Sequence, residues 1–178
     1  EAKTGYRLEL SPYNANFTDE AMRALLMRAE VWAYPATGTD SIIAALDAQA
    51  VWFRILRYAG MWALLGYGMW AIEDRANGEL LGEAGLLSAA RGLAELDGVP
   101  EAGWVLGPAA WGRGIATEAM AAIFAWTDAH LDAPSIRCII APDNGGSIKV
   151  AEKLGFAALA EVDFHGAPTR VFDRPRQG

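Results

Sequence analysis

The segment from Trp111 to Thr117, Trp-Gly-Arg-Gly-Ile-Ala-Thr, has the residue types and spacing of an anion-binding loop. Gly112 and Gly114 allow the backbone to come close to a ligand. The amides that follow begin a predicted helix at the positive end of its dipole, which suits a phosphate group. Arg113 adds a positive charge for the same anion. The segment therefore predicts a site for a phosphate-bearing molecule.

Two common phosphate-binding motifs do not fit this segment. A P-loop needs Gly-x-x-x-x-Gly-Lys-Ser/Thr, and the chain contains no such run. A dinucleotide fingerprint needs Gly-x-Gly-x-x-Gly, but Thr117 stands at its third glycine position. Nucleotide binding by a Rossmann-like domain stays open as a weaker alternative, as does a glycine-rich connection that holds no ligand.

Two glutamates, Glu83 and Glu101, are candidates for general-base chemistry. Each lies on a predicted strand that is otherwise apolar or small, where a carboxylate can accept a proton directly or through water. The alternatives are an ion pair or, for Glu101 at the start of its strand, simple exposure. We favour Glu83, because Gly82 and Gly85 would leave open space around it for a substrate.

The remaining polar residues favour no metal chemistry. Two isolated histidines and one cysteine do not form a zinc-binding pattern. Cys138 lies among isoleucines in a predicted strand, so we expect it to be buried and inert. His130 ends a predicted helix, where the helix dipole favours a cation.

The elements that position these residues follow from hydrophobic periodicity. In the first half we expect a strand at 6–10 ended by Ser11-Pro12, a helix at 18–33, and a helix from Thr39 or Asp40 to about Tyr58 with Phe53 inward. Asn77-Gly78 predicts a hairpin with a type I′ turn before a strand at 80–87.

In the second half, a strand at 101–106 leads through the glycine loop into a helix from Ile115. A strand at 136–141, parallel to the previous one, and a short helix capped by Asn144 follow. Gly155 suits the end of that helix, before a hairpin of strands at 156–162 and 168–172. The order predicts one mixed α/β sheet domain over residues 1–178.

Composition limits the classes of function. The chain has 178 residues, 53% of them hydrophobic, with seven tryptophans, which is enough for one well-packed core. The net charge is −7 without a basic run, which disfavours nucleic-acid binding. The longest charge-free run, residues 58–72, is too short and glycine-rich to cross a membrane. We expect a soluble, cytoplasmic protein without a disulfide.

The glycine segment resembles the pyrophosphate loop of the GNAT superfamily of acyl-CoA N-acyltransferases, Arg/Gln-x-x-Gly-x-Gly/Ala. Trp111 replaces the first Arg or Gln, as is common in the RimJ/RimL-type branch, where an aromatic residue precedes Gly-Lys/Arg-Gly-x-Ala-Thr-Glu-Ala. A second family motif matches at Asn144-Gly-Gly-Ser147 and Glu152-Lys-Leu-Gly-Phe156. Together the two motifs resemble the family over nearly the whole chain.

This resemblance implies a GNAT-like α/β domain with a mixed, mostly antiparallel sheet and a central strand–helix–strand–helix unit. It implies an N-acetyltransferase that uses acetyl-CoA as cosubstrate, needs no metal, and lets a primary amine attack directly in a ternary complex. In the family the strand before the loop bulges and splays from the next strand, so that its amides face the thioester. The implied cofactor-binding residues are Trp104, Val105, Leu106, Trp111, Gly112, Arg113, Gly114, Ile115, Ala116, Thr117 and Asn144.

The acid that protonates the leaving thiolate is less well matched. Many family members use a tyrosine on the last helix, but Ala151 stands at that position. Ser147 is the substitute that RimJ/RimL-type members suggest, and its alternative role is in the helix start. The missing tyrosine keeps open an acyl-CoA-binding or regulatory domain without turnover. The acceptor can be a protein N-terminus, a small amine or an aminoglycoside. A homodimer is a possible assembly of the chain.

Overall fold

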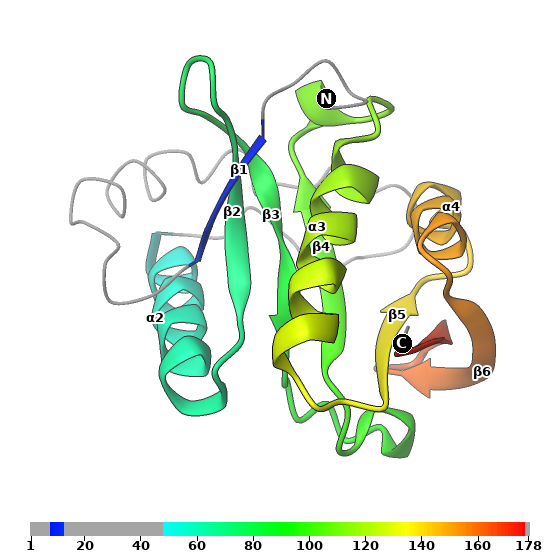
Figure 1. The fold of residues 1–178 in the computed structure, drawn as a ribbon. Helices are drawn as coiled ribbons and strands as arrows, with labels where there is room; N and C mark the ends of the chain where they lie inside the picture. Colours follow the sequence, from blue (N-terminus) through cyan, green and yellow to red (C-terminus); the bar gives the residue numbers. More distant parts are fainter. Residues whose placement is uncertain (1–7, 13–47, 177–178) are drawn as a thin grey trace.

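The computed structural model describes residues 8–12 and 48–176, which form one seven-stranded sheet in the order β1-β2-β3-β4-β5-β7-β6 (Figure 1). Only the central β4–β5 pair is parallel; all other neighbours are antiparallel, which confirms the mixed, mostly antiparallel sheet. The strands are β1 (Leu8–Pro12), β2 (Met69–Asp74), β3 (Glu79–Leu87), β4 (Glu101–Leu106), β5 (Ser135–Ile140), β6 (Ala157–Phe164) and β7 (Ala167–Pro175).

Two helices cover opposite faces of this sheet. Met69 and Ala71 pack in a cluster with Ile55, Tyr58 and Met61 of α2 (Ala48–Leu65), whereas their neighbours Trp70 and Ile72 pack in the cluster that contains α3 (Ile115–His130). Since side chains alternate along a strand, α2 and α3 lie on different faces. Figure 1 shows α3 lying along the sheet over β4, with α4 (Gly145–Lys153) following β5. The central β4-α3-β5-α4 unit is therefore confirmed.

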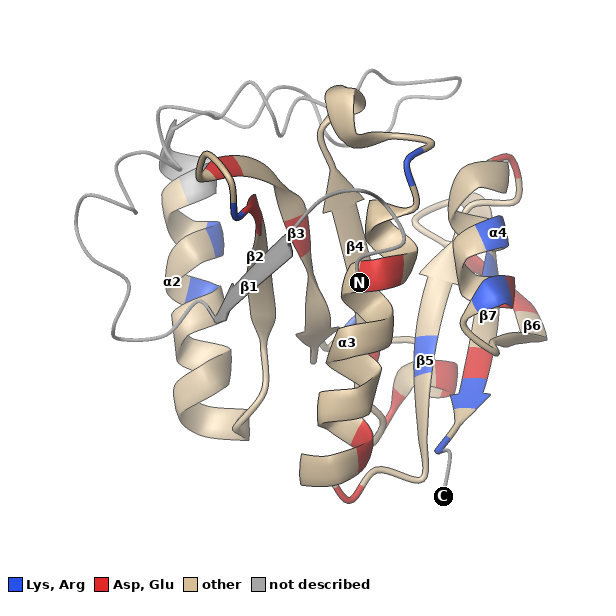
Figure 2. Ribbon diagram, turned by 45° about the horizontal axis from the view of Figure 1, so that its top comes forward, with Lys and Arg blue, Asp and Glu red and all other residues tan. Residues whose placement is uncertain are grey.

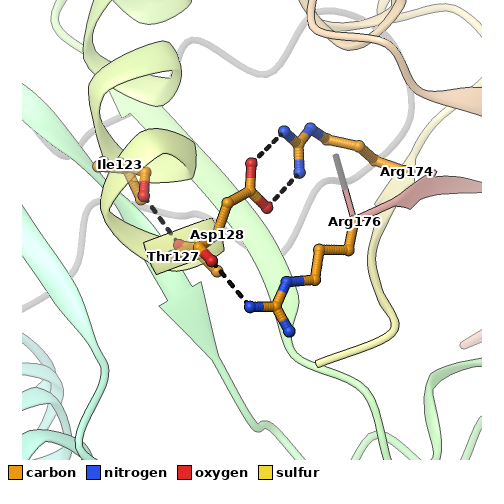
Figure 3. Close-up of polar contacts among 5 residues, drawn as sticks. All are labelled: Ile123, Thr127, Asp128, Arg174 and Arg176. Carbon is orange, nitrogen blue, oxygen red and sulfur yellow. Dashed lines mark hydrogen bonds and ion pairs between the residues drawn. The ribbon is translucent and has the colours of Figure 1, made fainter. Parts of the chain in front are cut away.

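The C-terminal end of α3 is fixed to the last strand by a charged contact (Figure 3). Arg174 donates to both carboxylate oxygens of Asp128 at 3.2 and 2.8 Å, and Arg176 donates to the backbone oxygen of Asp128 at 2.9 Å. The Arg174 guanidinium also lies 4.4 Å from the centre of the Phe124 ring. These contacts hold α3 against the β5–β7–β6 half of the sheet.

Aromatic residues on the α3 face form part of the core. The rings of Trp62, Trp70 and Trp126 meet edge to face, with centroids 4.7 to 5.7 Å apart. Trp62 and Trp70 therefore pack in the core. Trp52 is more exposed, and Trp32 lies outside the described residues.

The predicted helix at 18–33 and the start of the next one at Thr39 or Asp40 also lie outside the described residues. The predicted end of the second helix is wrong, because α2 continues to Leu65. Phe53 was expected inward but is 59% exposed. The first strand continues through Pro12, which an edge strand such as β1 tolerates because one side of its backbone has no neighbouring strand.

The hairpin between β2 and β3 exists, but its turn is not of type I′. Among these residues Gly78 has a positive φ of 70°, whereas Asn77 does not, and a type I′ turn requires both. Instead the Gly78 amide donates a hydrogen bond to the backbone oxygen of Asp74. The Asp74 side chain accepts a second hydrogen bond, from the Ala76 amide. The Asp74 side chain therefore helps to set a longer turn.

Candidate active site

Strands β4 and β5 pair at only one end. Their register contains a single pair, Glu101 opposite Arg137, where the Arg137 amide donates to the backbone oxygen of Pro100 at 3.1 Å. The Gly107 amide donates to Leu81 of β3, so the alternate residues Trp104 and Leu106 direct their amides toward β5. The two strands therefore part beyond Glu101, and the Trp104 amide faces the resulting gap.

This splay agrees with the expected family geometry, but the expected bulge is not present in the β3–β4 ladder. The register runs without a shift from Gly82 opposite Leu106 to Leu87 opposite Glu101. The amides of β4 reach the gap by ordinary strand alternation. A bulge is therefore not needed to direct the β4 amides toward the gap between β4 and β5.

The glycine loop lies directly beyond the open end of β4. Gly112 and Gly114 have φ values of 69° and 78°, a left-handed conformation that favours glycine. The first helical hydrogen bond of α3 runs from the Glu118 amide to the Gly114 oxygen, so the amides of residues 115–117 precede the helical ladder. Trp111 fixes the loop by donating its indole hydrogen to the Leu106 oxygen at 2.8 Å, and Arg113 is exposed on the loop. The loop thus carries backbone amides and a positive charge, which are the groups that bind an anion.

The start of α4 lies at the same end of the sheet, after β5 (Figure 1). Asn144 caps this helix by accepting a hydrogen bond from the Ser147 amide at 3.0 Å, as predicted. The Phe156 amide donates to the Ala151 oxygen and Gly155 has a φ of 86°, which confirms the predicted helix end. Ser147 is half-buried in the first turn, while Ala151 is buried.

Glu83 is buried in an ion pair on the α2 face. It is 1% exposed, accepts a 2.7 Å hydrogen bond from Tyr58, and pairs with Arg54. Figure 2 shows the basic positions of α2 on its side nearest the sheet. Burial raises the pKa of Glu83, while Arg54 and the Tyr58 hydrogen bond act in the opposite direction.

The prediction of open space around Glu83 is wrong. A Cβ atom at Gly82 would overlap the backbone oxygen of Val105, and one at Gly85 would overlap the backbone of Gly68. These glycines allow β3 to approach its neighbouring strands closely. They leave no room for a substrate.

Glu101 is also buried, so the alternative of an exposed strand end is wrong. It is 5% exposed, and the Arg91 Nε lies 2.9 and 2.7 Å from its two carboxylate oxygens. Unlike Glu83, Glu101 lines a cavity of about 480 Å³, together with Arg91 and Tyr67. Glu101 and Trp104 are three positions apart along β4, a Cα separation of roughly 10 Å. Glu101 is therefore the candidate carboxylate with open space beside it.

Sequence reasoning missed the arginine partners of both glutamates. Arg54 and Tyr58 are four residues apart on α2, a spacing that places them on one helix face, but no pattern links them to Glu83. Arg91 lies in the connection between β3 and β4, ten residues before Glu101 in the chain. Only the tertiary fold brings these residues together.

The other polar candidates have structural contacts. Cys138 is 1% exposed and burial raises the pKa of its thiol, with the nearby charge of Glu101 acting in the same direction. His130 Nδ1 lies 2.7 Å from the Trp126 oxygen. In the described part of the chain no group of three or more His, Cys, Asp or Glu side chains could hold a metal ion. In the same ranges no helix is long and apolar enough to cross a membrane.

Comparison with known proteins identifies a family with this geometry. A family model described as an acetyltransferase (GNAT) domain matches residues 7–157. A solved GNAT-family acetyltransferase from Bordetella pertussis is 30% identical, with a TM-score of 0.79 over 98% of this chain and 97% of that one. The ribosomal-protein alanine acetyltransferase of Vibrio fischeri shares the fold, with 16% identity and a TM-score of 0.65 over 99% of this chain and 95% of that one.

A curated relative matches a shorter region. The uncharacterized protein YkkB of Bacillus subtilis strain 168 is 32% identical over 111 residues. That match covers 61% of this chain and 63% of the relative, so the chain spans less than two thirds of that protein's length.

Proposed function

The chain belongs to the GNAT acetyltransferase family, and we propose that it transfers an acetyl group from acetyl-CoA to a primary amine by direct attack in a ternary complex. The observation that carries this proposal is the parting of β4 and β5 next to the glycine loop at the start of α3. The amine nitrogen bonds to the acetyl carbon, the C–S bond of the thioester breaks, and the pair of electrons leaves with the thiolate of CoA.

The glycine loop supports the placement of the CoA pyrophosphate. The amides from Gly112 to Thr117 would donate to its oxygens, with Trp111 holding the loop and Arg113 supplying charge. The pantetheine arm would run through the gap between β4 and β5 and pass Asn144 at the start of α4. The amides of Trp104 and Leu106, which point toward this gap, would stabilise the oxyanion that forms at the thioester carbonyl.

Glu101 is our proposed general base. Glu83 is held by two partners with no space beside it, whereas Glu101 lines a cavity. Roughly a tenth of α-amino groups are neutral at pH 7, against about one in a few thousand lysine side chains. A lysine acceptor therefore demands a stronger base than an α-amine does, which favours an α-amine acceptor. Since Glu101 lies three residues from Trp104, the proton would pass through an intervening water.

Ser147 is the proposed hydrogen-bond donor to the leaving sulfur. Ser147 lies in the first turn of α4, and the start of this helix is at the same end of the sheet as the glycine loop. A thiolate is a tolerable leaving group near neutral pH, so we expect this contact to contribute less than the base. A homodimer and a cytoplasmic location remain predictions.

The alternative function is an acyl-CoA-binding domain without turnover. Two observations favour it: both candidate bases are held by arginines, and Ala151 replaces the family's tyrosine.

Release of free CoA separates the two functions. The protein is incubated with acetyl-CoA and a panel of peptides with free N-termini, small amines and aminoglycosides, and thiol formation is followed. Amine-dependent release above the rate with acetyl-CoA alone supports the transferase. Tight binding of acetyl-CoA with no amine-dependent release would establish the binding domain instead.

A further inference from the structure

We propose that Arg91 is a positioning residue for Glu101, and that Phe164, in the hairpin of β6 and β7, holds Arg91 in place. This inference rests on the proposed function, because it assigns a role to Glu101 in acetyl transfer. It adds two residues that lie outside both family motifs: Arg91 in the connection between β3 and β4, and Phe164 at the end of β6.

The contact between Arg91 and Glu101 has a fixed geometry. One nitrogen, Nε, donates to both carboxylate oxygens, at 2.9 and 2.7 Å. The Glu101 side chain is buried and that of Arg91 is 29% exposed, so the pair closes one wall of the cavity that both residues line. A buried carboxylate needs such a partner to remain charged. Arg91 therefore fixes both the orientation and the charge of Glu101.

The backbone before Arg91 is held in an unusual conformation. Ala90 has a φ of 46°, in the left-handed region that non-glycine residues rarely occupy, and it lines the same cavity. Such a conformation persists where surrounding contacts require it. At this position it precedes the arginine that pairs with Glu101.

Phe164 contacts the guanidinium from a second element. The Arg91 Cζ lies 5.4 Å from the centre of the Phe164 ring, within the range of a cation–π interaction. Phe164 is half-buried at the end of β6, where it pairs with Ala167. The hairpin therefore contacts the connection between β3 and β4, although β6 is the far edge of the sheet. The position of this hairpin and the orientation of Glu101 are coupled through Arg91.

Few other charged groups face Glu101. Arg137, opposite it in β5, is occupied by Asp173 at 2.9 Å and by the Glu95 backbone oxygen. Cys138 is buried and its raised pKa keeps it neutral. Among the described residues, Arg91 is therefore the cation whose loss would most change the surroundings of the Glu101 carboxylate.

The test compares Arg91→Gln, Arg91→Lys and Phe164→Leu with the wild type, using the amine identified by CoA release. Arg91→Gln should lower kcat about 10²-fold, with little change in the KM for acetyl-CoA, because the glycine loop lies at the other end of β4. Arg91→Lys should restore part of kcat. Phe164→Leu should lower kcat by a smaller factor. Arg170→Gln, which removes a surface pair with Glu161 on the same hairpin, is the matched control and should change neither quantity.

A double-mutant cycle distinguishes positioning from a purely structural role. If Arg91 acts through Glu101, Arg91→Gln should have almost no further effect on kcat in a Glu101→Gln background. Equal fold-losses in both backgrounds, or an unchanged kcat in Arg91→Gln, would overturn the inference while leaving the acetyltransferase intact. A wild-type protein that binds acetyl-CoA but acetylates no amine would overturn the proposed function, and this inference with it.

Discussion

Tyr58 donates a 2.7 Å hydrogen bond to Glu83 across the contact between α2 and β3, where neither side chain is more than 2% exposed. Arg54 donates to the same carboxylate oxygen and, at 2.7 Å, to the Tyr58 hydroxyl. The three side chains form a closed polar cluster on the face opposite α3. This arrangement stabilises the docking of α2 on the sheet.

Replacement of Glu83 should therefore affect stability more than catalysis. Glu83→Gln removes the carboxylate charge from this buried pair, and breaking a buried pair typically costs about 3 to 5 kcal/mol of unfolding free energy. Urea denaturation measures the change. Glu79→Gln, at the exposed start of β3, is the control and should lie within about 0.5 kcal/mol of the wild type. A stable Glu83→Gln protein with a large loss of acetyl transfer would instead identify Glu83 as the base.

The glycine loop predicts a selective loss of CoA binding. Gly114→Val places a side chain where the amides of α3 would meet the pyrophosphate, so CoA affinity measured by calorimetry should fall below detection. The substitution also strains a residue with a φ of 78°. Gly78→Val is a matched control, since Gly78 has a φ of 70° and open space around it in the β2–β3 turn. Both variants should lose similar stability. Normal CoA affinity in Gly114→Val would remove the pyrophosphate-loop assignment.

Burial of Cys138 predicts a dependence of stability on alkaline pH. The thiol ionises above about pH 8.5 in the unfolded chain. Burial raises its pKa in the folded protein, which keeps the proton there. The unfolded state then binds fewer protons, so the unfolding free energy falls as pH rises.

This contribution is absent from Cys138→Ala. Between pH 8 and pH 10 the stability advantage of the wild type over this variant should narrow by about 2 kcal/mol in urea denaturation. Tyr58 is present in both proteins, so its own titration cancels in the difference. A constant gap between the two proteins would show that the Cys138 thiol ionises as readily in the folded protein as in the unfolded chain.

The conformations around the glycine loop could be predicted from the sequence more closely than the surroundings of Glu83 and the inward side of α2. Gly112, Gly114, Asn144 and Gly155 take their conformations from local turn and cap chemistry, so nearby residues were enough to predict them. Gly82 and Gly85 were misinterpreted because their role depends on backbone atoms of adjacent strands. Phe53 was expected inward, but the side of α2 that packs against the sheet carries Ile55, Tyr58 and Met61.

The two ion pairs could not be predicted for a similar reason. Arg54 and Glu83 are separated by 29 positions, and Arg91 meets Glu101 through a connection without regular periodicity. Long-range pairing of this kind depends on how α2 and the β3–β4 connection pack on the sheet. Residue type and spacing identified both carboxylates as candidates, but only tertiary contacts distinguish a closed cluster from a carboxylate that lines a cavity.

The rate of acetyl transfer by Glu101→Gln, measured from pH 6 to pH 10 with an α-amine acceptor, tests the central claim most directly. Loss of a general base typically costs ~10²–10⁴-fold. We expect a deficit of that size at pH 7 that shrinks as pH rises and the amine deprotonates unaided, with acetyl-CoA affinity unchanged. Full activity of Glu101→Gln near pH 7 would contradict the assignment of Glu101 as the base.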